Sequence, residues 1–122
     1  MERRFSLLEG CVLVSMEQGQ APGDIVEVLL EAASLARQEG RDGLLIVSGV
    51  RDPATAPALC DAILAMSRVG APPPSRIAFI AYQFPQYDSY HFAAAFAPNH
   101  GFEAKLFVSL NEAKAWAMRR PG

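Results

Sequence analysis

The sequence predicts a layered α/β domain. Its mixed, mainly parallel five-stranded sheet has an N-terminal antiparallel hairpin and four flanking helices, in the order ββαβαβαβα. Two short apolar runs near the N-terminus are separated only by Glu9 and Gly10, which is typical of a tight hairpin. Later apolar runs of strand length alternate with segments of helical period, and this order needs crossover connections between parallel strands. With 122 residues the chain has room for one compact domain, residues 1–122.

The first half of the chain supplies three predicted strands and a helix. "RFSLL" and "CVLVSM" are the two strands of the hairpin. The segment "PGDIVEVLLEAASLARQEG" has an apolar stripe at helical spacing, and we expect Asp24 to cap its start and Gly40 to end it. "GLLIVSG" is a continuous apolar run bounded by glycines, which predicts a central strand covered on both faces.

The second predicted helix lies in "DPATAPALCDAILAMSRVG", where Asp52 stands at a cap position and Pro53 at the first helical position. Pro57 could delay the regular helix, in which case "RDPATA" would form a loop. The buried stripe of this helix is expected to contain four residues: Leu59, Cys60, Ile63 and Leu64.

The second half of the chain repeats the strand and helix pattern. The proline run 72–74 ends the preceding helix, and "RIAFIAY" is a second strand that looks buried on both faces. "DSYHFAAAFAP" predicts a helix closed by "PNHG", and "EAKLFVS" predicts the fifth strand. In the last helix, "SLNEAKAWAMRR", Ser109 and Glu112 have the spacing of a capping box.

The composition argues against several classes of function. A net charge of -2 provides no general attraction for nucleic acid or an anionic membrane. No apolar stretch approaches the roughly 20 residues that span a bilayer, and no secretory cleavage pattern follows the first residues, so we expect a cytoplasmic protein without a membrane span. Cys11 and Cys60 lack redox or zinc spacing and should be reduced, buried thiols. The sequence has no metal motif or glycine-rich nucleotide loop, and we predict no metal and no cofactor.

Three features resemble a known family. The element order, "RIAFIAY" followed by an aromatic stretch, and the run "GFEAKLFVSLNEAKAWA" are similar to the SpoIIAA-like group of STAS domains, relatives of bacterial anti-sigma factor antagonists. The resemblance covers nearly the whole chain as architecture, while its residue pattern is concentrated in residues 76–117. It implies a STAS-like fold and a non-enzymatic, regulatory role in protein–protein interaction.

The same resemblance points to Thr55 as a candidate phosphorylation site. Anti-sigma factor antagonists are phosphorylated on Ser or Thr in a pattern similar to D-x-S-G-V-x-x-x-D-S, and alignment on "SGV", residues 48–50, places Thr55 on the acceptor. Both acidic positions of the pattern are apolar here, Ile46 and Ala54. A phosphate at a helix N-terminus would still be favourable, although a plain turn or cap role for Thr55 is the stronger interpretation.

Five aromatic residues crowd into "AYQFPQYDSYHF", residues 81–92. This segment leaves the carboxyl end of the fourth strand and "SGVRDPAT" leaves that of the third, which is where open α/β sheets bind ligands. Pro85 should keep the segment irregular and exposed, whereas Phe92 and Phe96 should be core residues and Tyr90 half-buried. We therefore predict an interaction surface of five residues: Tyr82, Phe84, Tyr87, Arg51 and Asp52.

These observations favour a protein–protein interaction or regulatory module over an enzyme, with a protein partner on the aromatic surface. One alternative is a carrier or sensor of a lipid or other apolar small molecule, which an aromatic rim could bind. A weaker one is a hydrolase-type enzyme using Asp88 and His91, three positions apart on the predicted helix, because no nucleophile motif accompanies them. Edge strands of the hairpin or exposed helix faces could also pair two copies in a homodimer.

Overall fold

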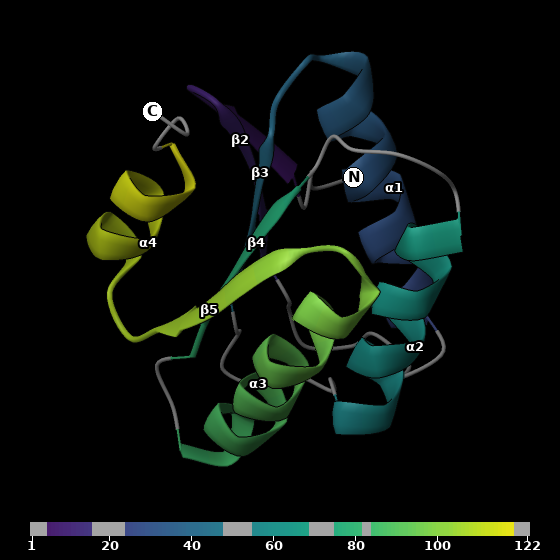
Figure 1. Cartoon of the computed structure of the whole chain (residues 1–122). Helices are drawn as coiled ribbons and strands as arrows, with labels where there is room; N and C mark the ends of the chain where they lie inside the picture. The colour runs from purple at the N-terminus through teal and green to yellow at the C-terminus, as the bar shows by residue number, and fades with distance from the viewer. Residues whose placement is uncertain (1–4, 16–23, 48–54, 69–74, 82–83, 119–122) are drawn as a thin grey trace.

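The computed structural model describes residues 5–15, 24–47, 55–68, 75–81 and 84–118. Figure 1 shows a twisted sheet with helices on both of its faces. The elements in chain order are β1 (Phe5–Leu8), β2 (Cys11–Ser15), α1 (Asp24–Gln38), β3 (Gly43–Val47), α2 (Ala56–Arg68), β4 (Arg76–Ile80), α3 (Phe84–Phe96), the 3-10 helix η1 (Ala97–His100), β5 (Glu103–Phe107) and α4 (Leu110–Ala117).

The sheet confirms the predicted fold class. Its five strands lie side by side in sequence order, with β1 antiparallel to β2 and each later neighbour parallel. Gly10 turns the opening hairpin with a φ of 75°, a conformation that glycine adopts without steric cost. Because consecutive parallel strands are joined by crossovers of one hand, α1, α2 and α3 cover one face of the sheet, and α4 lies on the other (Figure 1).

The larger core lies between the sheet and the first three helices. Alternate residues of β2, β3 and β4 point into it, as the two-residue period of a strand requires. Fully buried side chains of this core include Val12, Ile25, Leu29, Leu44, Ile46, Leu59, Ile63, Ile77, Phe79 and Tyr90. The other alternate residues of β3 and β4 face α4, so both central strands are covered on both sides as predicted.

The smaller core lies under α4. Ala113 and Ala117 of α4 pack on buried residues of the sheet, and Trp116 contacts the ring of Phe107 with the centroids 5.6 Å apart. At one border of this core, Arg76 is buried and donates from Nη1 to the Trp116 carbonyl over 3.1 Å. Its Nε lies 3.6 Å from Oε2 of Glu103. Arg76 thus places a cation at the C-terminal end of α4, where the helix dipole favours positive charge.

Two predicted helix ends are confirmed. After α1, the Arg41 N–H donates to the Ala36 carbonyl over 2.8 Å and Gly40 has a φ of 67°, which is the Schellman arrangement. At the start of α4, Ser109 is the N-cap, and its side chain accepts from the Glu112 N–H over 3.4 Å.

Of the two starts expected for α2, the structure shows the later one, and one further expectation needs correction. The helix begins at Ala56 with Thr55 as its cap, close to the start delayed by Pro57, while Asp52 lies outside the described ranges. Its buried residues are four, spaced by three or four positions: Leu59, Ala62, Ile63 and Met66. Cys60 and Leu64, which were expected in the stripe, are only half-buried because they lie at the margin of the face that packs inward.

Candidate interaction surface

The aromatic stretch of the sequence forms most of α3. Pro85 does not keep this segment irregular, because the helix already begins at Phe84 and Pro85 falls in its first turn. A missing N–H costs nothing there, since the first N–H groups of a helix have no intrahelical partner. Tyr87 therefore lies on a helix rather than in a loop.

The face directed at the sheet is built from Tyr90 and Ala93 of α3 and from Ala97, the first residue of η1, all of which are fully buried. The Tyr90 ring meets Phe79 of β4 edge to face, with the centroids 5.8 Å apart and the planes at 69°. The expectation that Tyr90 is half-buried is wrong. The two small alanines allow the helix to lie close to the sheet, and Tyr90 fills the space beside Phe79.

The opposite face of α3 exposes aromatic side chains. Phe92 is 57% exposed and Tyr87 is 38% exposed, so the prediction that Phe92 belongs to the core is wrong. Phe92 follows the buried Tyr90 by two positions, which rotates it about 200° around the helix, away from the sheet. Phe96, the other expected core residue, is half-buried against the larger core. The α3 outer face, as we name it, consists of five exposed residues: Tyr87, Asp88, His91, Phe92 and Ala95.

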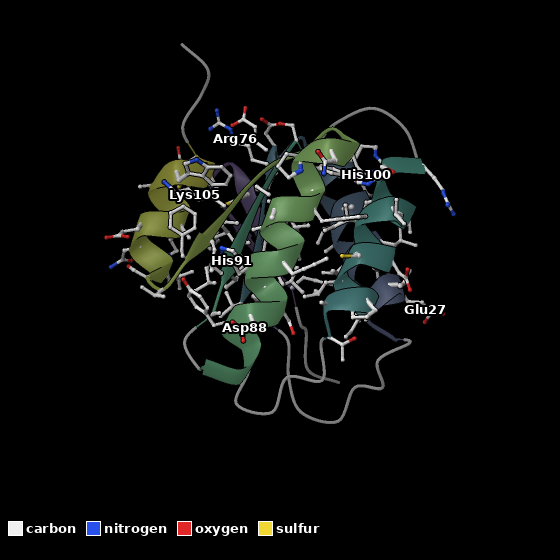
Figure 2. All side chains as sticks on the ribbon, turned by 60° about the horizontal axis from the view of Figure 1, so that its bottom comes forward. Glu27, Arg76, Asp88, His91, His100 and Lys105 are labelled. Atoms are coloured by element: carbon white, nitrogen blue, oxygen red, sulfur yellow. The ribbon has the colours of Figure 1, made fainter. Side chains whose placement is uncertain are left out.

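One ring pair lies on the α3 outer face. Tyr87 and His91 are one turn apart, and their rings stack with the centroids 6.2 Å apart and the planes at 16°. Figure 2 shows Asp88 and His91 on the same helix. Both are exposed, and in the described part of the chain no ion pair joins them. In the described structure the ring of His91 therefore has Tyr87 as its partner.

The predicted five-residue surface can be followed only in part. Tyr82, Arg51 and Asp52 lie outside the described residues. Phe84 opens α3, and its side chain is not described. Tyr87 is exposed, as expected. The surface as a set of five stays a prediction, and Phe92 is the exposed ring that sequence reasoning missed. The available indication was the spacing of two positions between Tyr90 and Phe92, because residues two apart on a helix point in nearly opposite directions and cannot both face the sheet.

Thr55 has a structural role that its position explains. Its Oγ1 accepts from the Ala58 N–H over 3.3 Å, and its carbonyl accepts from the Leu59 N–H over 3.0 Å. The side-chain bond satisfies the Ala58 N–H, which would otherwise be unpaired in the first turn of α2, and the carbonyl bond is the first bond of the helix ladder. The side chain is exposed, and phosphorylation of Thr55 stays a prediction.

The two thiols differ in burial. Cys11 is fully buried, and burial raises the pKa of its thiol against the opposing effect of Arg41 and Lys114. Cys60 is half-buried rather than buried as expected; partial burial raises its pKa, and the nearby Asp61 carboxylate raises it further. Neither environment produces the lowered pKa of a reactive thiolate. Across the described residues, no three His, Cys, Asp or Glu side chains come together in a way that could hold a metal ion.

Comparisons with known proteins add no identity to this surface. No family model, no curated protein and no solved structure matches the chain. Among the described helices, none has the length and apolar character needed to cross a membrane.

Proposed function

We propose that this chain is a non-enzymatic, STAS-like protein–protein interaction or regulatory module that docks on a protein partner through the α3 outer face. The observation that carries the proposal is the exposure of Phe92, at 57%, on a helix whose inner face is fully packed. The STAS-like element order and the final "F-x-S-x-x-E-A-x-x-W" pattern agree with such a module.

The chemistry of the α3 outer face suits a protein partner. Two exposed rings provide apolar area with few rotatable bonds, and aromatic residues are enriched among the residues that dominate binding energy. Asp88 and His91 stand beside the rings and offer polar groups at the rim. Truncation of a central aromatic residue commonly costs about 2 kcal/mol of binding free energy, which is roughly a 30-fold loss of affinity.

The test is capture of partners from the native host on immobilised protein. Wild type should be compared with the Tyr87→Ala/Phe92→Ala double variant, and Leu7→Ala is the matched control. Leu7 is also a large exposed apolar residue, at 47%, but it lies on β1 at the opposite edge of the sheet from β5. A partner that binds wild type and Leu7→Ala should be lost from the double variant. Equal capture by all three proteins would refute the proposal.

Native mass spectrometry separates the proposal from the carrier alternative. The module should appear as bare protein, whereas a copurifying apolar molecule would favour a carrier or sensor. The enzyme alternative depends on Asp88 and His91, whose side chains are exposed and not paired with each other in the described structure. A hydrolytic activity lost in His91→Ala and retained in Tyr87→Ala would favour that alternative over the module.

A further inference from the structure

β5 forms one edge of the sheet, and its backbone groups alternate in direction. The Glu103 N–H donates to the Ser75 carbonyl over 2.9 Å, and the Phe107 carbonyl accepts from the Ala81 N–H over 3.0 Å. Both residues therefore direct their backbone groups toward β4, and so does Lys105 midway between them. The N–H and carbonyl groups of Ala104 and Leu106 consequently point away from β4, on the side where no other strand of the described residues lies beside β5.

On the face that α4 shares, two β5 side chains are exposed, Glu103 and Lys105, whereas the third, Phe107, is buried in the smaller core. α4 packs mainly over β3 and β4, so Glu103 and Lys105 remain exposed at the edge. The Glu103 side chain is 67% exposed even though it contacts Arg76. The Lys105 ammonium lies 5.5 Å from the centroid of the Phe107 ring on the same face. Figure 1 shows β5 as the last strand of the sheet, on the viewer's side.

An edge of this kind can be extended by another strand. Two copies of β5 related by a two-fold axis would run antiparallel, with outward-pointing residues opposite one another. With Ala104 at the axis, Glu103 faces the partner's Lys105 and Lys105 faces the partner's Glu103. This register gives two opposite-charge pairs at positions where the strands approach most closely. A shift that puts Lys105 at the axis would instead oppose two ammonium groups.

We propose that β5 pairs antiparallel with β5 of a second copy of this chain, in the register centred on Ala104. The backbone bonds of the dimer would run from each Ala104 N–H to the partner's Ala104 carbonyl, and from each Leu106 N–H to the partner's Phe102 carbonyl. The Phe102 N–H already donates to the Ala97 carbonyl over 3.3 Å and takes no part. The result is one continuous sheet across two copies.

The experiment measures the mass of the full chain in solution across a range of concentrations, by sedimentation or light scattering. Wild type should move from 13.2 kDa to twice that mass as concentration rises. Lys105→Glu opposes carboxylates in both symmetric pairs and should weaken the dimer at least about tenfold. Glu103→Lys should do the same by opposing ammonium groups. Circular dichroism checks that both variants fold, which matters for Glu103→Lys because it also removes the contact with Arg76.

The decisive measurement uses a mixture of Glu103→Lys protein with Lys105→Glu protein. The first variant has lysine at positions 103 and 105, and the second has glutamate at both. One copy of each therefore forms two opposite-charge pairs again. A heterodimer should therefore form in the mixture while each variant alone is weakened. In wild type, the Ala104 amide should exchange with solvent more slowly at concentrations where the dimer forms.

Three outcomes would overturn the proposal. A wild type that stays monomeric at every concentration would mean that Lys105 protects an unpaired edge. A dimer insensitive to Lys105→Glu would place the contact elsewhere, and a mixture that forms no heterodimer would exclude this register. The Tyr87→Ala/Phe92→Ala variant should dimerise like wild type, so this result and the partner test on the α3 outer face can fail separately.

Discussion

The approach of α4 to β3 makes Gly43→Ala the most informative stability experiment. Gly43 is buried at the start of β3, beside Cys11 of β2 and beneath the last turn of α4. A Cβ added at Gly43 would lie 3.1 Å from the Cβ atoms of both Ala117 and Cys11, and 3.2 Å from the Ala117 carbonyl oxygen. Comfortable carbon–carbon contact is about 3.5 to 4.0 Å, so the helix end or the strand must move.

The expected cost follows from two opposing effects. Overpacking of a core by one methyl group costs about 1 to 3 kcal/mol. Replacement of glycine by alanine also raises the free energy of unfolding by about 0.4 to 1 kcal/mol, because it lowers the conformational entropy of the unfolded chain. The difference between these ranges runs from about 0 to about 2.6 kcal/mol, and we expect its middle, a fall of about 1 to 2 kcal/mol in the free energy of unfolding. Such a loss lowers the Tm by roughly 4 to 10 °C for a domain of this size. Urea and thermal unfolding followed by circular dichroism measure both quantities.

A double-mutant cycle tests the stated cause. Ala117→Gly removes one of the crowded Cβ atoms, so the cost of Gly43→Ala should be smaller in that background than in wild type. Rescue should be partial, since the Ala117 carbonyl oxygen and the Cys11 Cβ remain. Gly40→Ala is the control: it has open space around it and a φ of +67°, so it costs about 1 kcal/mol through backbone strain that Ala117→Gly cannot relieve. A Gly43→Ala protein as stable as wild type, or additive costs in the cycle, would refute the reasoning.

Further predictions concern the α2 cap, the two sides of α3, and the reactivity and titration of the two thiols. Thr55→Ala should lower the free energy of unfolding by about 1 kcal/mol, with Thr55→Ser near wild type in the same urea assay; an unchanged midpoint for the alanine variant would contradict the cap. Tyr90→Ala should lower the free energy of unfolding by about 3 to 5 kcal/mol, because Tyr90 is buried, and Phe92→Ala should lower it by less than about 0.5 kcal/mol, because Phe92 is exposed. Similar losses for the two variants would contradict the assigned faces of α3. A thiol reagent should modify Cys60 before Cys11 in the folded protein, and Cys11 only as fast as the chain opens. Burial raises the pKa of both thiols above the ordinary value of 9.0, so the folded protein holds these protons more tightly than the unfolded chain does. The stability that this difference contributes is present below pH 9.0 and is lost as the pH rises through the raised pKa values. Urea unfolding measured at a series of pH values checks this loss.

The element order, the opening hairpin and the two doubly covered strands were predictable from the sequence. Each depends on a local pattern: a turn glycine, a continuous apolar run or a capping residue. Gly40 and Ser109 show this well, because the conformation and hydrogen bond that end or begin a helix involve only neighbouring residues. Two starts stayed open for α2 because Asp52 and Thr55 are both good caps, and the structure selects Thr55, in the cap role that was the stronger interpretation of that residue.

The surface of α3 was decided by the tertiary structure. Its sequence is rich in aromatic residues and alanine all the way around, so the helical period does not distinguish an inner face from an outer one. Close approach to β4 selected Tyr90 and Ala93 for the inner face of α3, continued by Ala97 of η1, and left Phe92 exposed.

The free edge of the sheet was likewise set by long-range pairing. Alternation along "EAKLF" predicts a strand, but it does not say whether a second neighbour lies beside it. Only the sequential strand order leaves Ala104 and Leu106 without a neighbouring strand on their outer side in the described sheet. The sequence by itself thus determined which segments become strands and helices, because those choices depend on neighbours within a few residues. Which faces and edges remain available to a partner depended on how those segments pack, because burial is a property of the whole fold.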